Sequence, residues 1–543
     1  DLAPNSPEHS RQPAAEASLL ADLPHNPRYL AHLSEALDEN DIPRAMSVVR
    51  DGWFDLLSGD RRALVDVVER MSNEASRAPL LAMLAGLVHY VAPHRRIKGL
   101  RFFIGAARAA GSHRRDVAPL DRALIMTSAS VSYRLLGRAT SGLRSARAAL
   151  QALHEMSNEE RGSVRALPRL YGQLGTTLFY AGDVDGALTA FEYGLAEMPS
   201  GSYPHGFTNL AMLAGIHALH GELPEAYRYI GLVRERSWPD VVQSMYPGTF
   251  YRIAEAWVAL DEIDPQRAAH HLDAMVHDRT TIEHWIAIAV TEVYTELLAG
   301  RPGHALAGLD AFAASRGSEG RSGATRSILA PTRALLLTAL GNPDAALVIL
   351  QRDGPASPSR FIAQARAELA LGNLGASLQC LRKVDGARLT ARERAAHAAL
   401  EAASMLRFSE RGRLHARLDR LGALLENTHQ RLALLLLPRG DYDRVLAALR
   451  DAGYGGLLTG LPEAPLILEI DAERLLSPRE VAVLQSLVRN QSTARIAAEL
   501  VVSVNTVKSQ LRSIYRKLGV STRDRAIAVA LDRHLIGPRR DGP

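Results

Sequence analysis

Residues 476–531 read LSPREVAVLQSLVRNQSTARIAAELVVSVNTVKSQLRSIYRKLGVSTRDRAIAVAL, and this stretch predicts four short helices in succession. Residues 477–480 form a capping box with proline at the first helical position, which marks the start of the first helix. Ser492 is expected to cap the second helix, over residues 495–500, because its hydroxyl can accept a hydrogen bond from a free N–H group.

The third and fourth predicted helices also have clear boundaries. Ser503 is expected to cap a helix that begins at Val504, and Gly519 lies where a left-handed residue would end it. Ser521, with Asp524 three residues later, is expected to cap the fourth helix. Four short helices joined by short turns predict a helix-turn-helix domain.

The predicted third helix is amphipathic. Its apolar side chains follow the i, i+4, i+7, i+11 spacing of one helix face: Val507, Leu511, Ile514 and Leu518. The opposite face has cationic and neutral polar groups and no acid: Asn505, Ser509, Arg512 and Arg516, flanked by Thr506, Lys508 and Ser513. Such groups can bind phosphates and read base edges in the major groove, although basic faces are also common on solvated helices.

The positive charge of the chain is concentrated at its C-terminal end. Residues 474–543 contain 13 Lys and Arg against 5 Asp and Glu, a net charge of +8. The whole chain contains 64 against 59, so the remaining residues contain 51 against 54, a net charge of −3. Attraction of nucleic-acid phosphates is therefore expected at the C-terminal domain.

The order of residues in this domain resembles the LuxR-type helix-turn-helix, whose pattern is L-[ST]-x-R-E-x-x-V-L, then I-A-x-x-L-x-x-S-x-x-T-V-K-x-H, then I-x-x-K-L-G-V. The residues that fit are Leu476, Ser477, Arg479, Glu480, Val483, Leu484, Ile496, Ala497, Leu500, Ser503, Thr506, Val507, Lys508, Ile514, Lys517, Leu518, Gly519 and Val520. Gln510 differs from the usual histidine but can still bond a phosphate or a base. Thr493 and Ala494 also differ from the usual residues, and the match covers about an eighth of the chain.

This resemblance implies a recognition helix over residues 504–518 and a dimer contact through the fourth helix, residues 522–532. It places Lys508, Ser509 and Arg512 at base edges, and Thr506 and Lys517 near the DNA backbone. A dimer would bind a two-fold operator with half-sites about one helical turn apart. The candidate DNA-binding residues are Ser503, Asn505, Thr506, Lys508, Ser509, Gln510, Arg512, Arg516 and Lys517.

Residues 28–450 repeat a pattern of small and bulky side chains. The clearest copy resembles the tetratricopeptide consensus at Gly175, Leu178, Gly182, Ala187, Phe191, Gly194 and Pro199. Gly175 and Ala187 would let two helices pack closely, and Phe191 would fill the seam with the next repeat. Turn positions follow at 137, 182, 221, 261, 300, 341 and 372, mostly 39 to 45 residues apart. We therefore expect an all-α fold, in which an α-helical solenoid precedes the C-terminal domain.

The other segments are assigned from composition. Residues 1–27 contain Pro, Ser, Ala and Glu without a period and are expected to be disordered. Residues 451–473 have the turn chemistry of a linker, which would let the next domain swing or be held by the solenoid. The helix-turn-helix domain is assigned to residues 474–537, with its core over 492–518, and a tail to 538–543. The chain begins with Asp, which suggests a fragment or a processed product.

The sequence offers no catalytic or cofactor site. No nucleophile–base pair, metal-ligand cluster or phosphate loop occurs at usable spacing, so we expect neither an enzyme nor a bound cofactor. Cys380 is the only cysteine, which excludes disulfides within the chain. No apolar stretch reaches the roughly 18 residues that span a bilayer, so no membrane partner is expected. Without a signal segment, the expected location is the cytoplasm.

The order of solenoid, linker and LuxR-type domain also resembles the large ATP-dependent regulators that include the bacterial maltose regulator. Those proteins carry a nucleotide-binding module ahead of their repeats, but no G-x-x-x-x-G-K-[ST] motif occurs here. Either this sequence is a piece of a longer chain, or the regulator dispenses with ATP.

The motifs of this sequence are compatible with two functions. The resemblance implies a transcriptional regulator, and by analogy an activator, that binds promoter DNA as a homodimer and acts on RNA polymerase. Its solenoid would sense an unknown effector or partner protein. The alternative is a tetratricopeptide-like scaffold that binds partner proteins, with DNA binding secondary.

Overall fold

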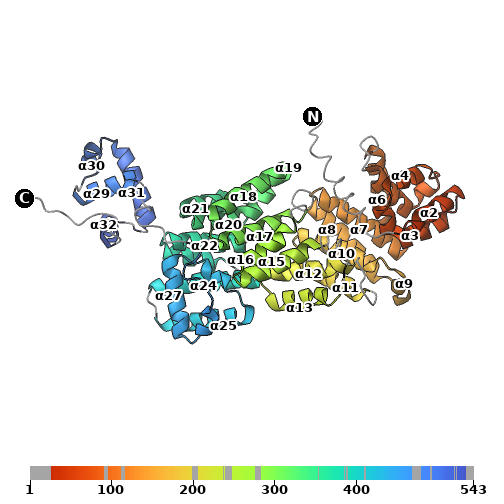
Figure 1. The fold of residues 1–543 in the computed structure, drawn as a ribbon. Coiled ribbons are helices and arrows are strands. Elements are labelled where there is room, and N and C mark those ends of the chain that lie inside the picture. Colours follow the sequence, from red (N-terminus) through yellow and green to blue (C-terminus); the bar gives the residue numbers. More distant parts are fainter. Residues whose placement is uncertain are drawn as a thin grey trace, which may run out of the picture. The chain divides into compact units, whose positions relative to one another are not determined.

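A computed structural model gives the fold of the chain (Figure 1). It describes residues 26–90, 96–111, 117–198, 206–236, 238, 248–275, 283–352, 354–384, 386, 389–408, 411–467, 478–489, 492–518, 520 and 522–532. The predicted disordered segment 1–27 and tail 538–543 lie almost wholly outside these residues.

The described residues confirm the all-α prediction, since they include no β-strand; an isolated parallel bridge joins Pro438 and Ile467. The chain divides into two compact units: residues 1–219, 223–258 and 270–288 form the first, and residues 220–222, 259–269 and 289–543 the second. No described helix is both long enough and apolar enough to cross a membrane.

The helices fall into three successive groups. The first comprises α2 (Arg28–Asp38), α3 (Ile42–Ser58), α4 (Arg61–Glu69), η2 (Ala75–Arg77), α5 (Pro79–Tyr90), α6 (Arg96–Gly111), α7 (Pro119–Leu135), α8 (Ala139–His154), α9 (Asn158–Ser163), α10 (Leu167–Tyr180), α11 (Val184–Ala196), α12 (Phe207–His220) and α13 (Leu223–Arg234). The second comprises α15 (Thr249–Asp261), α16 (Pro265–Asp273), α17 (Trp285–Leu298), α18 (Pro302–Ser315), α19 (Gly317–Gly320), α20 (Gly323–Ala339), α21 (Pro343–Arg352), α22 (Pro358–Ala370), α23 (Leu374–Arg382), α24 (Ala391–Phe408), α25 (Arg411–Thr428), α26 (Leu432–Leu435), α27 (Arg439–Asp451) and η8 (Gly455–Leu458). The third comprises α29 (Pro478–Arg489), α30 (Thr493–Glu499), α31 (Val504–Leu518) and α32 (Arg523–Asp532).

Consecutive helices before residue 452 pack as hairpins, as the repeat pattern predicts. Helix α7 packs on α8, α10 on α11, α20 on α21 and α22 on α23 (Figure 1). The predicted turn glycines 137, 182, 221, 300, 341 and 372 have φ between 67° and 83°, a left-handed conformation that suits glycine. The N–H of Gly182 donates to the Phe179 carbonyl at 3.0 Å, and that of Asp183 to the Leu178 carbonyl at 2.9 Å. These two bonds form a Schellman motif, so the prediction of the turns is confirmed.

One predicted turn position was wrong. Asp261 is the last residue of α15, and the left-handed residue is Ile263, with φ of 65°. The N–H of Ile263 donates to the Leu260 carbonyl at 3.0 Å, which reproduces the bond that Gly182 makes. Sequence reasoning failed here because a β-branched residue rarely adopts this conformation.

The clearest repeat shows why small residues recur. A Cβ atom on Gly175 of α10 would lie 2.6 Å from Cε1 of Phe191 on α11, so only glycine lets the ring pack there. Phe191 thus contacts its own hairpin, and its expected place in the seam with the next repeat stays a prediction. Gly194 makes room for Asn209 of α12, the neighbouring repeat, whose side-chain atoms would lie 2.6 to 2.8 Å from a Cβ.

A buried acid ties together elements of the second unit that are far apart in sequence. Asp261 has a fully buried side chain and accepts two hydrogen bonds from Arg392 of α24, at 2.8 and 2.9 Å. Gln430, between α25 and α26, donates to the same carboxylate at 3.2 Å. These contacts join residues 131 and 169 positions apart, which a solenoid with neighbour contacts alone would not produce.

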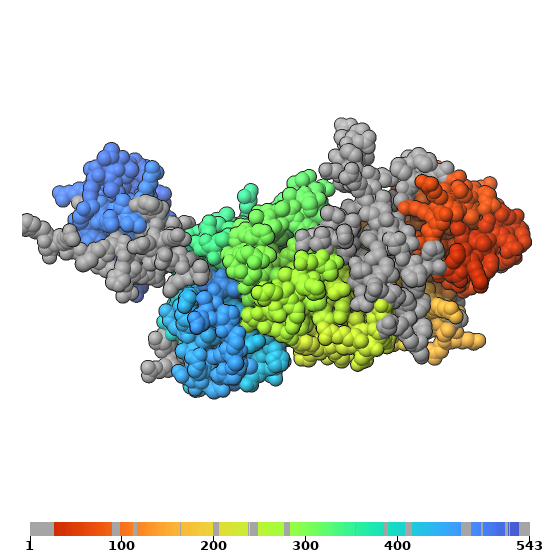
Figure 2. Space-filling model, in the orientation of Figure 1, coloured from red at the N-terminus to blue at the C-terminus, as the bar shows by residue number. Residues whose placement is uncertain are grey.

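The first part of the predicted linker is held against the repeats. The N–H of Leu466 donates to the Leu435 carbonyl at 2.8 Å, and the Tyr442 hydroxyl donates to the Pro462 carbonyl at 2.7 Å. Ile467 is fully buried. The helices α25 and α27, to which this part of the chain is attached, form a closely packed blue body in the space-filling view (Figure 2). Residues 468–473 of the predicted linker lie outside the described residues.

Candidate nucleic-acid interface

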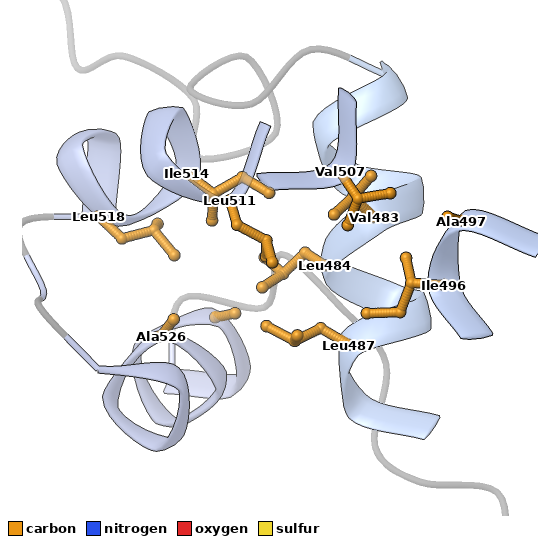
Figure 3. Packing of buried hydrophobic residues seen from close by; sticks show 11 residues of the cluster. Val483, Leu484, Leu487, Ile496, Ala497, Val507, Leu511, Ile514, Leu518 and Ala526 are labelled. Atoms are coloured by element: carbon orange, nitrogen blue, oxygen red, sulfur yellow. The ribbon is translucent and has the colours of Figure 1, made fainter. Parts of the chain in front are cut away.

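Helices α29 to α32 surround a hydrophobic core of their own (Figure 3). The buried side chains are Val483, Leu484 and Leu487 of α29, Ile496 and Ala497 of α30, Val507, Leu511, Ile514 and Leu518 of α31, and Ala526 and Ala530 of α32. The predicted apolar stripe of the third helix is therefore confirmed. Because this core includes residues from all four helices, it fixes the orientation of α31 within the domain.

Two of the four predicted caps, Ser492 and Ser503, lie at helix starts in the structure. Ser492 accepts a hydrogen bond from the Ala494 N–H at 3.2 Å, although α30 begins two residues earlier than predicted. Ser503 accepts from the Thr506 N–H at 3.0 Å, and the two hydroxyls lie 2.8 Å apart. These bonds satisfy the first turn of α31, which begins at Val504 as predicted.

The fourth helix begins one residue later than the sequence suggested. Thr522 precedes α32, and its hydroxyl accepts a hydrogen bond from the Arg525 N–H at 3.4 Å. Thr522 is therefore at the cap. The predicted cap Ser521 and the predicted stop Gly519 both lie outside the described residues, as do Leu476 and Ser477.

The turn between α30 and α31 has an unexpected left-handed residue. Val501 has φ of 54° and is 90% exposed. The Val502 N–H donates to the Ala497 carbonyl, five residues earlier, at 3.0 Å, which is the bond of wider sequence separation in a Schellman motif. Sequence reasoning missed this turn residue because valine gives no left-handed signal.

The outward face of α31 presents most of the predicted DNA-binding side chains. Exposed residues are Ser503, Asn505, Thr506, Lys508, Ser509 and Arg512, whereas Gln510 is half-buried. Neither Lys508 nor Arg512 has an ion pair or side-chain hydrogen bond among the described residues. Both cations are therefore available to a ligand. The side chains of Arg516 and Lys517 lie outside those that the structure describes.

Ser513 faces the domain and not solvent. Its hydroxyl donates to Oε1 of Glu480 on α29 at 2.7 Å, and Glu480 is 6% exposed. Glu480 thus helps to hold α31 at a fixed rotation, a role that the sequence did not assign to it. Burial raises the pKa of Tyr515, the next aromatic residue on α31, above its ordinary value, so its hydroxyl stays neutral.

Comparison with known proteins identifies this region. Residues 474–530 match the family described as bacterial regulatory proteins of the luxR family. The C-terminal domain is a luxR-family domain. A luxR-family helix-turn-helix of this kind suggests a DNA-binding transcriptional regulator.

Two curated relatives match the same end of the chain. One is the transcriptional regulatory protein YdfI of Bacillus subtilis (strain 168), 39% identical over 64 residues, which are 12% of this chain and 30% of the relative. The other is the probable transcriptional regulatory protein NarL of Mycobacterium tuberculosis, 45% identical over 62 residues, 11% of this chain and 29% of the relative. The chain therefore spans about a third of the length of these relatives, and the likeness concerns the luxR-family domain.

Proposed function

We propose that the protein is a transcriptional regulator that binds promoter DNA through the outward face of α31. The observation that carries this proposal is the pair of exposed, unpaired cations Lys508 and Arg512, set among neutral polar side chains. An ordinary solvated helix face would tolerate acids there, whereas on a DNA-binding face they are disfavoured because phosphates repel carboxylates.

The mode of binding is insertion of α31 into the major groove. Lys508 and Arg512 meet guanine edges or phosphates, and Asn505 and Ser509 lie beside them to bond other base edges. The N-terminus of α31, where the Ser503 hydroxyl accepts from the Thr506 N–H, lies beside a phosphate of the DNA backbone. Gln510, Arg516 and Lys517 complete the proposed contact set.

The wider assembly is proposed by analogy with the family. A homodimer forms through α32, binds a two-fold operator and activates transcription by contact with RNA polymerase in the cytoplasm. The helical repeats sense an effector or a partner protein, and the chain has no catalytic role. Among the described residues no cluster of three potential metal ligands occurs.

Substitution at α31 tests the groove contacts. Lys508→Ala should weaken binding to a selected operator by about 1–3 kcal/mol if the side chain reads a base. Because Lys508 is exposed and unpaired, the fold should be unaffected. Arg420→Ala, which removes an exposed cation of α25, is the matched control. Equal operator affinity for Lys508→Ala and the unmodified chain would contradict the proposed docking of α31.

A further inference from the structure

Three buried charged residues of the second unit have an opposite charge beside them: Asp261, Arg316 and Asp441. Asp441 has a fully buried side chain and accepts hydrogen bonds from Arg407 at 2.6 and 2.7 Å, much as Asp261 does from Arg392. Pairs of this kind are expected, because an ion taken out of water without a partner costs several kcal/mol.

Arg366 of α22 is different. It is 6% exposed, and its one hydrogen bond runs from Nε to the backbone carbonyl of Leu436 at 3.2 Å. Among the described residues no carboxylate pairs with it, and its two terminal nitrogens donate no hydrogen bond.

Arg360, on the same helix, shows how a structural arginine is accommodated here. It is 5% exposed, and its guanidinium donates to the backbone carbonyls of Leu350, Gly354 and Pro355. Arg360 therefore has acceptors on several sides. Arg366 has one, and burial lowers its pKa, while the nearby Tyr294 of α17 opposes that change.

The position of Arg366 connects it to the segment that leads to the luxR-family domain. Its acceptor, Leu436, follows Leu435, whose carbonyl binds the N–H of Leu466. On the other side, Pro438 forms the isolated bridge with Ile467. The guanidinium thus bonds to the short stretch of chain that anchors residues 466 and 467.

We propose that Arg366 is the anion-binding residue of an effector site between α22 and the turn from α26 to α27. The ligand is a small molecule with a carboxylate or phosphate group, because a guanidinium binds either through two parallel hydrogen bonds. The effector role rests on the proposed regulatory function; the anion site itself does not.

Binding at this site would act on the anchor of the C-terminal segment. An anion that accepts hydrogen bonds from Nε and one terminal nitrogen of Arg366 replaces the Leu436 carbonyl as the acceptor of Nε, and the neighbours of Leu436 hold residues 466 and 467. The exchange of one acceptor for another is therefore coupled to the backbone that precedes the luxR-family domain.

Hydrogen exchange of the full chain tests the site without DNA. Inorganic phosphate and acetate are added separately, each against chloride of equal ionic strength. With either phosphate or acetate at about nine times its Kd, hydrogen exchange in α22 and residues 432–437 should slow about tenfold relative to chloride. The anion that slows exchange shows whether the ligand carries a phosphate or a carboxylate. Equal exchange in phosphate, acetate and chloride would overturn the proposal.

Two variants separate an anion site from a structural arginine. Arg366→Met should keep the exchange pattern of the anion-free chain, since an apolar side chain of similar size can replace a buried charge, and should lose the anion response. Arg382→Gln, an exposed arginine of α23, should keep the response. If Arg366→Met instead unfolds the repeats while the unmodified chain shows no response, Arg366 is structural and the proposal fails. If the chain responds to the anion but binds no promoter DNA, the proposed regulatory function is refuted and the proposed anion site stands.

Discussion

His284 makes the first unit sensitive to mild acid. The side chain is 2% exposed, its Nδ1 is hydrogen-bonded with the Tyr180 hydroxyl, and its ring stacks on that of Tyr180 at 5.6 Å. Burial lowers its pKa from 6.5 to about 4; Glu283 opposes this change and Arg134 adds to it. The folded state thus holds a neutral ring at a pH where the unfolded chain takes up a proton.

The sign and size of the effect follow from the two pKa values. The stability due to neutral His284 is complete above about pH 6.5 and is lost as the pH falls toward about 4, by about 3 kcal/mol in all. Between about pH 7.5 and about pH 5.5, where most carboxylates stay ionised, the expected loss is about 1.3 kcal/mol.

Urea unfolding followed by tryptophan fluorescence measures this loss. All four tryptophans, Trp53, Trp238, Trp257 and Trp285, lie in the first unit, and Trp285 is buried beside His284. His284→Phe keeps a ring but removes the titrating group. Over the same pH range the stability of this variant should therefore fall by about 1.3 kcal/mol less than that of the unmodified chain. An identical pH dependence in both proteins would refute the assignment.

Three further substitutions test the packing. Gly182→Ala should destabilise the first unit by about 1–2 kcal/mol through backbone strain alone, because no atom lies within 4 Å of the new Cβ. Gly231→Ala in α13 is the control, since that position is equally open but helical, and it should leave stability unchanged or raise it. Tryptophan fluorescence during urea unfolding measures both. Asp441→Asn should lower the stability of the second unit by about 1.5–3 kcal/mol, since it weakens the hydrogen bonds of the partly exposed Arg407 guanidinium; unchanged circular-dichroism melting would contradict this. Ser513→Ala should cost the luxR-family domain about 1.5–3 kcal/mol, with operator affinity unchanged while the domain stays folded; loss of affinity without loss of stability would instead place Ser513 at the DNA.

Local sequence patterns predicted much of this fold but could not predict contacts between residues far apart in the sequence. Glycine at the hairpin turns and the apolar stripe of α31 could be read from the sequence, because each reflects a local backbone or periodicity requirement. The left-handed Ile263 and Val501 could not, since valine and isoleucine disfavour that conformation. The contacts of Ser513 with Glu480 and of Asp261 with α24 join residues 33 and 131 positions apart, and no local pattern specifies such pairs.

Selection from random duplex DNA at near-physiological salt tests the regulatory function most directly. The full chain, residues 466–543 and the Lys508→Ala chain are selected in parallel. We expect an inverted repeat to be enriched by residues 466–543 and to be lost with Lys508→Ala. Enrichment by these residues but not by the full chain would mean that the repeats inhibit DNA binding until a signal arrives. If no sequence is enriched by either and binding is weak, uniform and abolished by salt, the function proposed for α31 is contradicted and the scaffold alternative is favoured.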